Sequence, residues 1–529
     1  MSRRTVSHYI AALAICLPVM ALLPAAGVAA AAAASSHVAD AVGAGRAVAG
    51  TATVTSGAGA GRAVMSQATV TTHVKLSPAI GTPASTVTVS GYRFGAKEAV
   101  DIYFDTTDEA LATTNASGAF RGVAVSIPAS AVPGIHWVTA VGRHSGLAAQ
   151  AAFTVRANWP QFRDTPTHRG FNTTENVLSP SSVSGLDNDW SYDTGGIVNS
   201  SPVVASGVAY VGSVDGSLYA LNASTGALLW SFATGASIEQ GAAFANGAVY
   251  VGSNDDNVYA LSASSGALLW SYDTGGPVNS SPAVANGVVY AGSNDSLFAL
   301  NATTGSLLWS YTTGGPINSS PAVANGVVYI GSGDDTIYAL NATTGALAWS
   351  APTLSPVSSS PAVANGRVYV GASDDIVRAF NAATGAFLWF FEANSPIESS
   401  PAVANGVVYV GSDDDNLYAL NAASGTLLWS YTTGGGVGSS PAVANGVVYV
   451  GSDDDTLYAL DAASGTPLWS YTTGGGVESS PAVANGVVYV GSGDDNLYAF
   501  GLPGGAADGV QRPGPASLRP NRHLRPSAG

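Results

Sequence analysis

The 529-residue sequence is poor in cysteine and in charged residues. Its one cysteine, Cys16, excludes a disulfide or a cysteine-based metal site within a single chain. Charged residues make up 10% of the chain, against about 25% in average globular domains. Lys, Glu, Gln and Arg are too scarce to cover helix surfaces, which argues against a helical protein. The formal net charge of −16 argues against nucleic acid as a partner.

Residues 1–34 have the pattern of an export signal. Arg3 and Arg4 precede an apolar run from Ile10 to Leu23, and small residues fill positions 25–34. This run is shorter than the roughly 20 residues that a membrane-spanning helix needs. We therefore expect a signal peptide, a secreted or cell-surface protein, and no stable membrane span after the signal is cleaved.

Three further segments differ from one another in composition. Residues 35–72 are rich in Ala, Gly, Val, Ser and Thr, which predicts a flexible linker. Residues 504–529 are rich in Pro, Arg and Gly, which predicts a disordered tail. Between them, residues 73–156 contain short alternating runs separated by Gly, Pro and Asn, a pattern typical of an antiparallel β-sandwich. Motifs such as Val87-Thr88-Val89-Ser90-Gly91 resemble the Ig-like modules of exported bacterial proteins, and this resemblance implies a spacer or an adhesive stalk.

The strongest signal is a tryptophan that recurs every 40 residues, with one interval of 39. The tryptophans are Trp190, Trp230, Trp270, Trp309, Trp349, Trp389, Trp429 and Trp469. A fixed period of this size, built from short strands and tight turns, predicts a β-propeller with four strands per blade. In a typical unit an inner strand Ser-Pro-Ala-Val-Ala is followed by an Asn-Gly hairpin, a strand Val-Val-Tyr-Val-Gly, an Asp-rich turn, a strand Leu-Tyr-Ala-Leu and an outer strand that holds the tryptophan. Seven units have the Asn-Gly pair, and the first has Ser206-Gly207 instead.

Counting the strands predicts how the ring closes. Eight inner strands are present, but only seven outer strands follow them. The segment Leu186–Tyr192, around Trp190, can supply the missing outer strand and remove the free edge. We therefore predict an all-β chain in which residues 157–503 form an eight-bladed propeller closed by an N-terminal strand, preceded by the Ig-like sandwich.

The tryptophan motif resembles that of a known family. The pattern Ala220-x-Asn222-x-x-Thr225-Gly226-x-x-x-Trp230 recurs with small changes through the repeats. It resembles the tryptophan-docking motif of the PQQ-like β-propellers, which include the eight-bladed quinoprotein alcohol dehydrogenases and the outer-membrane assembly lipoprotein BamB. The segment Trp159-Pro160-Gln161-Phe162-Arg163 is similar to the lead-in that many such proteins carry before blade one. The resemblance implies that the indoles dock between adjacent blades and that the dehydrogenases bind their cofactor at one end of the channel.

The residues of the predicted ring argue against quinoprotein chemistry. Residues 190–500 contain no His, Lys or Cys, and 23 acidic residues against two arginines give them a formal charge of −21. The cofactor PQQ is a tricarboxylate and needs cations or a metal ion to offset its charge. The family's dehydrogenases also use a vicinal disulfide, which this chain cannot form. Without histidine, residues 190–500 cannot build a Ser-His-Asp triad or a histidine-based zinc site. We expect no cofactor, with PQQ and Ca²⁺ as the alternative, and the sequence favours a protein that is not an enzyme.

Two sets of polar residues are candidate sites. The position before each Ser-Ser-Pro, or before Gln240-Gly241-Ala242 in the second unit, is predicted at the mouth of the channel. There it would bind a cation, a polyol or a basic peptide, or else form a hydrated rim. Its members are Asn199, Glu239, Asn279, Asn318, Ser358, Glu398 and Glu478, with Gly438 in the remaining blade. The Asp-rich turns offer oxygen ligands for Ca²⁺, or they are solvated hairpin tips. The metal candidates there are Asp413, Asp415, Asp453 and Asp455.

Taken together, these patterns predict an exported, non-catalytic binding or scaffold protein. Its partner would be an unknown protein or a cell-surface glycan, with no nucleic acid. The alternatives are a quinoprotein-type dehydrogenase or another propeller enzyme, a BamB-like envelope assembly factor, and a rigid spacer.

Overall fold

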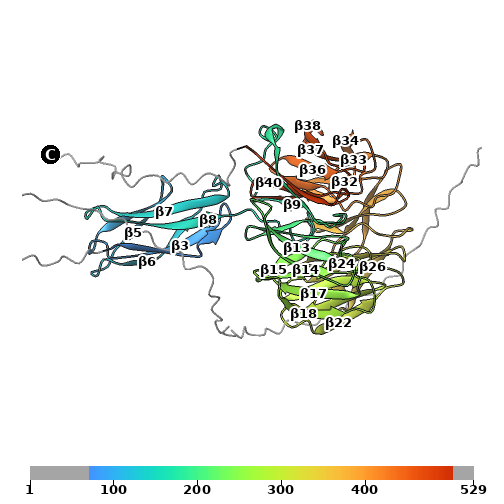
Figure 1. Cartoon of the computed structure of the whole chain (residues 1–529), viewed down its shortest axis with the longest axis horizontal. Helices are drawn as coiled ribbons and strands as arrows, with labels where there is room; N and C mark the ends of the chain where they lie inside the picture. The colour runs from blue at the N-terminus through green and yellow to red at the C-terminus, as the bar shows by residue number, and fades with distance from the viewer. Residues whose placement is uncertain (1–70, 504–529) are drawn as a thin grey trace, which may run out of the picture. The chain divides into compact units, whose positions relative to one another are not determined.

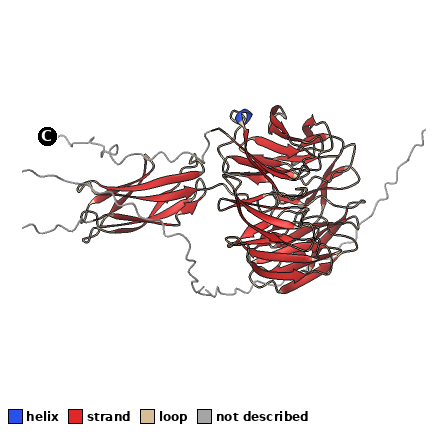
Figure 2. Cartoon of the chain, viewed as in Figure 1, coloured by secondary structure: helices blue, strands red, loops and turns tan. Residues whose placement is uncertain are grey.

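The computed structural model describes residues 71–503, and they form a chain built almost entirely of β-strands (Figures 1 and 2). The predicted signal peptide, nearly all of the predicted linker and the predicted tail lie outside the described residues. The one helical element in this part is the short 3₁₀ turn η1 (Val183–Gly185). No helix among residues 71–503 has the length and apolar character of a membrane span.

The first part of the described chain is a β-sandwich of two sheets. One sheet has the order β1-β3-β6 and the other has the order β2-β8-β7-β4-β5. The strands are β1 (His73–Ser77), β2 (Ile80–Gly81), β3 (Thr86–Tyr92), β4 (Ala99–Phe104), β5 (Thr107–Thr113), β6 (Phe120–Ser126), β7 (Gly134–Gly142) and β8 (Ala148–Val155). Side chains from both sheets, such as Val89, Ile102 and Phe153, are buried in one core. That this sandwich is an Ig-like module stays a prediction.

The sandwich contains three strands that the alternation pattern did not predict, namely β1, β2 and β5. Strand β5 has the sequence Thr-Asp-Glu-Ala-Leu-Ala-Thr and lies at the edge of its sheet, so most of its side chains need not be apolar. Strand β2 is two residues long and pairs parallel to β8, so this sheet is not purely antiparallel. Such a short segment carries too few residues for a periodicity to show.

One ionisable pair links two strand ends of the sandwich. The Nδ1 atom of His136 lies 2.7 Å from Oδ2 of Asp105, and its Nε2 atom lies 2.7 Å from the Val132 carbonyl oxygen. The hydrogen bond to Asp105 is the main cause that raises the pKa of His136 above its usual value. The protonated imidazole can donate to both acceptors, so the folded sandwich favours the charged form.

We predict that replacing His136 by Gln lowers stability at acidic pH more than at alkaline pH. The stabilisation by the histidinium is fully present below about pH 6.5, the ordinary pKa of the group, and is lost as pH rises through the raised folded-state pKa. Melting curves of the full chain and of His136→Gln between pH 5 and 9 test this. A difference between the two melting temperatures that stays constant across this range would contradict it.

The second part of the described chain consists of eight sheets, which we number blades 1 to 8 in chain order. Each has four antiparallel strands, and the sheet of blade 7 has a fifth strand, β9 (Phe171–Asn172), which pairs parallel with its inner strand. The inner strands are β11 (Val203–Ala205), β15 (Ala243–Ala245), β19 (Ala283–Ala285), β23 (Ala322–Ala324), β27 (Ala362–Ala364), β31 (Ala402–Ala404), β35 (Ala442–Ala444) and β39 (Ala482–Ala484). The second strands are β12 (Val208–Gly212), β16 (Ala248–Gly252), β20 (Val288–Ser293), β24 (Val327–Ser332), β28 (Arg367–Gly371), β32 (Val407–Gly411), β36 (Val447–Gly451) and β40 (Val487–Gly491). The third strands are β13 (Ser217–Asn222), β17 (Asn257–Ser262), β21 (Ser296–Asn301), β25 (Thr336–Asn341), β29 (Ile376–Asn381), β33 (Asn416–Asn421), β37 (Thr456–Asp461) and β41 (Asn496–Gly501). The outer strands are β14 (Leu228–Ala233), β18 (Leu268–Asp273), β22 (Leu307–Thr312), β26 (Leu347–Pro352), β30 (Phe387–Glu392), β34 (Leu427–Thr432), β38 (Pro467–Thr472) and β10 (Asp187–Asp193).

The turn between the first two strands of a blade shows why the repeat needs its Asn-Gly pair. In blade 2, Asn246 and Gly247 have φ values of 51° and 79°. Positive φ at both central positions defines the hairpin turn whose twist matches that of the flanking strands, and Asn and Gly adopt it most readily. The predicted turn is therefore confirmed, and it fixes the register of the inner strand against the second strand.

The last blade is completed by a strand from far upstream, as the strand count predicted. Strand β10 pairs antiparallel with β41, so Trp190 lies opposite Ala499. This is the register that Trp230 has with Ala220 inside blade 1. The ring is thus closed by pairing the two ends of the repeat array.

Each indole docks on the next blade through two contacts. In blade 8, Trp190 lies against Gly226 of blade 1, where a Cβ atom would come within 2.7 Å of the ring. The indole Nε1 atom donates to the Ala223 carbonyl, and the hydroxyl of Tyr489 donates to the same oxygen. Gly at this turn is required both by its positive φ and by the close approach of the ring. This two-donor clasp recurs between blades at the carbonyls of Ala223, Ala263, Ala302, Ala342, Ala382, Ala422 and Ala462.

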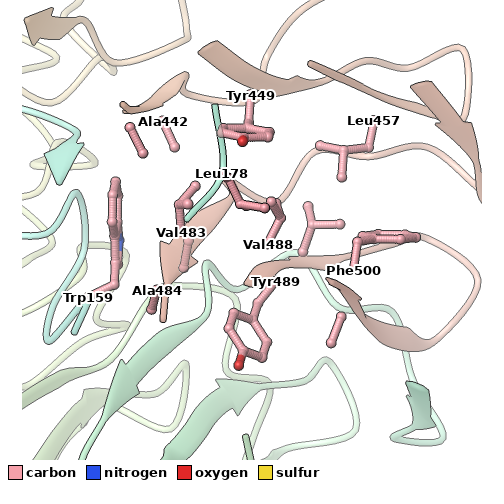
Figure 3. Close-up of a cluster of buried hydrophobic side chains, with 14 of the residues drawn as sticks. Trp159, Leu178, Ala442, Tyr449, Leu457, Val483, Ala484, Val488, Tyr489 and Phe500 are labelled. Carbon is pink, nitrogen blue, oxygen red and sulfur yellow. The ribbon is translucent and has the colours of Figure 1, made fainter. Parts of the chain in front are cut away.

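The interface between blades 7 and 8 differs because blade 8 has no turn from its own repeat at this place. There Trp469 donates to the Leu186 carbonyl, just before β10. The hydroxyl of Tyr449 is buried and has no hydrogen-bond partner among the described residues. Figure 3 shows Tyr449, Tyr489 and Phe500 in the apolar core around this seam.

We predict opposite effects for the same substitution at two tyrosines. Tyr409→Phe removes a 2.9 Å hydrogen bond to the Ala462 carbonyl and should destabilise the ring by about 1 kcal/mol. Tyr449→Phe removes a buried hydroxyl without a partner and should leave stability unchanged or raise it. Urea denaturation of both variants, followed by tryptophan fluorescence, tests this. Equal losses in both variants would contradict the two-donor clasp.

Candidate functional site

The serine pairs that precede the inner strands join neighbouring blades around the axis. The hydroxyl of Ser399 donates to the Ser439 carbonyl at 3.0 Å, and Ser439 donates to the Ser479 carbonyl at 2.9 Å. Across the closure, Ser479 donates to the Ser200 carbonyl at 3.0 Å. These bonds join blades 6, 7, 8 and 1 next to the residue that precedes each of their serine pairs.

The residues before the serine pairs line one cavity of about 680 Å³, which we call the cup. The structure brings together all seven predicted residues, Asn199, Glu239, Asn279, Asn318, Ser358, Glu398 and Glu478, with Gly438 in blade 7. The second serines of six pairs also line it, namely Ser201, Ser320, Ser360, Ser400, Ser440 and Ser480. That the cup binds a ligand stays a prediction, but the predicted residues do share one cavity.

The charges of the cup are unevenly distributed. Blades 6, 7 and 8 contribute Glu398, Asp413, Asp453 and Glu478, and blade 2 contributes Glu239. Blades 1, 3, 4 and 5 contribute amides and hydroxyls at these positions. No Arg, Lys or His is among the residues that line the cup. Its wall therefore carries four carboxylates on the side of blades 6 to 8, whereas Glu239 is the one acidic lining residue among blades 1 to 5.

The carboxylates on the acidic side of the cup repel one another. Burial, together with the charges of Asp453, Glu398 and Glu239, raises the pKa of Glu478 above its usual range. Burial and the charges of Glu398 and Asp453 likewise raise the pKa of Asp413. Carboxylates whose pKa is raised in this way are destabilised by each other and would gain from a positive charge placed between them.

A segment of residues 159–172, which we call the inner segment, runs around the inside of the ring. Trp159 exchanges two backbone hydrogen bonds with Val204 of blade 1. Further bonds follow in blade order: the amides of Phe244, Val323, Val363, Val403 and Val443 donate to carbonyls of the segment, Val284 donates to the Gln161 side chain, and Asn172 donates to the Val483 carbonyl. Phe162 of this segment lines the cup, which therefore has an aromatic ring at its base.

The inner segment also places buried ionisable groups inside the ring. Burial lowers the pKa of Arg163 to about 9 and raises the pKa of Asp164 to about 8. Burial, with the charge of Arg163, lowers the pKa of His168 to about 3, so this imidazole is neutral. His168 is fully buried and does not line the cup, so it cannot act on a ligand there. The sequence predicted a lead-in before blade one here, but not that this segment enters the ring. His168 lies outside residues 190–500, the range without histidine.

The Asp-rich turns have a structural role in the described chain. In blade 7, Oδ2 of Asp454 accepts hydrogen bonds from the amide of Gly434 in the preceding connection and from the hydroxyl of Tyr458. Asp415 and Asp455 occupy turn positions with φ values of 67° and 65°. Of the four metal candidates, Asp413 and Asp453 line the cup, whereas Asp415 and Asp455 do not. Among residues 71–503, no group of three or more His, Cys, Asp or Glu side chains is arranged to hold a metal ion. Calcium binding at these turns stays a prediction.

The cup does not fit the cofactor that the fold family implies. PQQ carries three carboxylates, and its binding needs cationic or metal partners. The wall instead offers carboxylates, amides and hydroxyls, and the guanidinium of Arg163 is fully buried outside the lining. We therefore derive no redox step for this site.

The closed ring of four-stranded sheets with docked indoles defines a PQQ-like β-propeller, and the comparisons with known proteins agree. The family model described as outer membrane protein assembly factor BamB matches residues 183–240, 214–319, 297–432 and 432–511, which is more than half of the chain. The chain belongs to this family. No curated protein shows significant sequence similarity to it.

Three solved structures illustrate the similarity. Quinohemoprotein alcohol dehydrogenase from Comamonas testosteroni is 17% identical, with a TM-score of 0.59, over 65% of this chain and 80% of that one. A europium-containing methanol dehydrogenase is 15% identical, with a TM-score of 0.58, over 65% and 98% of the two chains. BamB from Moraxella catarrhalis is 20% identical, with a TM-score of 0.53, over 60% and 99%. At these identities the likeness shows the fold alone.

We predict that Glu478→Gln raises the melting temperature of the unliganded protein at pH 7. The raised pKa means that the folded state binds this proton more tightly than the unfolded state, so the ionised carboxylate destabilises the fold above that pKa. The difference from wild type should vanish as pH falls through the raised pKa. Glu392→Gln, an exposed residue on β30 that does not line the cup, is the matched control. A lowered melting temperature in Glu478→Gln would show that the negative charge of Glu478 stabilises the folded state and would contradict this prediction.

Proposed function

We propose that this chain is an exported binding or scaffold protein whose propeller holds a ligand in the cup without chemical turnover. The observation that carries the proposal is the unequal wall, in which carboxylates gather on one side although they repel each other. A mere spacer has no need for charges that oppose folding, and strain of this kind is typical of binding sites. The cup also combines convergent polar groups with a volume within the range of small-molecule sites.

The composition of the cup supports a binding role rather than catalysis. Its lining holds no histidine, lysine or cysteine that could act as a base or a nucleophile beside the carboxylates and hydroxyls. The export signal predicted for residues 1–34 places the ligand outside the cytoplasm, as a cell-surface glycan or a protein. A sandwich ahead of the ring then acts as a spacer or an adhesive module.

Membership of the family favours a second candidate, which is assembly of outer-membrane proteins. The family description names an assembly factor, and one of the similar structures is a BamB. In that function the ring would bind protein partners through its surface and the cup would be incidental. The two candidate functions differ in whether substitutions of the residues that line the cup weaken binding of the partner.

The test compares wild type with the triple variant Glu239→Gln/Glu398→Gln/Glu478→Gln in cosedimentation with an insoluble cell-wall preparation. We expect saturable binding by the wild type and a loss of at least about tenfold in affinity in the triple variant, because three charges of the wall are removed. The control Glu392→Gln should bind as the wild type does. Absence of binding, or equal binding by the triple variant, would contradict the proposal that the cup binds a cell-surface ligand.

A titration with PQQ and Ca²⁺, followed by absorbance, tests the competing enzyme class. We expect no stoichiometric complex, because the wall repels a tricarboxylate. A tight one-to-one complex would overturn the non-catalytic proposal in favour of a quinoprotein.

A further inference from the structure

The acidic side of the cup defines the charge of its ligand. Glu398, Asp413, Asp453 and Glu478 come from three consecutive blades, and no cation lines the wall. A positive group between them would relieve their repulsion. The described residues do not arrange three acidic side chains as a metal site, so an organic cation fits better than a metal ion.

Buried hydroxyls supply the second, independent observation. Ser320, Ser360 and Ser400 line the cup and are only 2%, 4% and 4% exposed. Each accepts one backbone amide from the preceding blade. These hydroxyls accept from the backbone, and each hydroxyl proton is left available to donate to a ligand oxygen in the cup.

The neutral side of the cup adds hydrogen-bonding groups of both kinds. Asn279 and Asn318 carry amides that donate and accept, and Ser358 carries a further hydroxyl. Phe162 at the base is the one aromatic ring among the lining residues and gives an apolar surface for ligand C–H groups. A ligand that contacts both sides must therefore hold a cation and several oxygen atoms within one compact body.

We propose that the cup binds an amino sugar, that is, a polyol that carries a primary ammonium group. The ammonium lies among the carboxylates of blades 6 to 8, and the sugar oxygens accept from the serine hydroxyls and the asparagine amides. A single lysine or arginine side chain is an elongated group that would engage one side of the wall only, so a sugar is favoured over a basic peptide. This inference rests on the proposed function and names the ligand class of the same site.

Isothermal titration calorimetry of the full chain tests it with two matched probes, the β-1,4-linked glucosamine trimer and its fully N-acetylated form. We expect one-to-one binding of the free-amine trimer and an affinity at least about tenfold lower for the acetylated trimer, which keeps the hydroxyl and ring oxygens and gains amide carbonyls but has no charge. Glucosamine itself distinguishes a free amino sugar from the end of a glycan chain: equal affinities of monomer and trimer indicate the former.

Variants separate the two sides of the cup. Glu398→Gln/Glu478→Gln should weaken the free-amine trimer about tenfold and leave the acetylated trimer unchanged, since only a charged ligand uses these carboxylates. Asn318→Ala should weaken both trimers, and the control Glu392→Gln should weaken neither. Melting curves of each variant, compared with that of the wild type, show whether the variants are folded.

Other outcomes contradict the inference in distinguishable ways. Equal affinity for the two trimers would show that the ammonium group does not contribute to binding. Tighter binding of CaCl₂, of an oligolysine or of a peptide that copies residues 504–529, lost in Glu398→Gln/Glu478→Gln, overturns the amino sugar but keeps a ligand in the cup. No binding of any of these probes overturns the inference, whereas the proposed function is overturned only if the cosedimentation with cell-wall material fails as well.

Discussion

The structure depends on one interaction, the docking of an indole onto the glycine turn of the next blade. At seven interfaces the indole Nε1 and a tyrosine hydroxyl donate to a single alanine carbonyl, as Trp429 and Tyr409 do at Ala462. Because each blade makes this clasp with its successor, the interaction both spaces the blades and closes the ring without a disulfide. The seam between blades 7 and 8 keeps the indole bond but loses the tyrosine bond, because the chain just before β10 lies there in place of the glycine turn of a repeat.

Because the clasp lies at the outer strand of each blade, residues that face the inside of the ring can differ between blades without disturbing it. The serine pairs are nearly invariant among the blades and join them around the axis. The residue before each pair makes no such bond between blades, so it differs between otherwise similar repeats and lines the cup. The inner segment contacts all eight inner strands, and its Phe162 gives the cup a base. A repetitive scaffold thus carries a site that is not repetitive.

The sequence predicted the repeated parts well because their signals recur eight times. The strand order, the Asn-Gly turns, the docking tryptophans and the pairing of Trp190 with the last blade all follow from period and turn chemistry. It also predicted which residues line the cup, since equivalent positions in a closed ring face one axis. It missed the inner segment, because a stretch that contacts eight strands once each has no periodicity of its own. It also missed Asp413 and Asp453 in the cup wall, because which turn residue faces the axis depends on backbone geometry.

The most direct test of the closed ring is a disulfide across the pairing of β10 with β41, which completes blade 8. Asp193 and Asn496 are opposite each other on β10 and β41, and antiparallel partners of this kind have the spacing a disulfide needs. Asn416 and Thr432 hold the same register within blade 6 and serve as the control pair. With Cys16→Ser as background, the ring predicts that Asp193→Cys/Asn496→Cys oxidises as readily as Asn416→Cys/Thr432→Cys and keeps the native circular dichroism. Free thiols in Asp193→Cys/Asn496→Cys, under conditions that oxidise the control pair, would contradict a ring closed by its N-terminal strand.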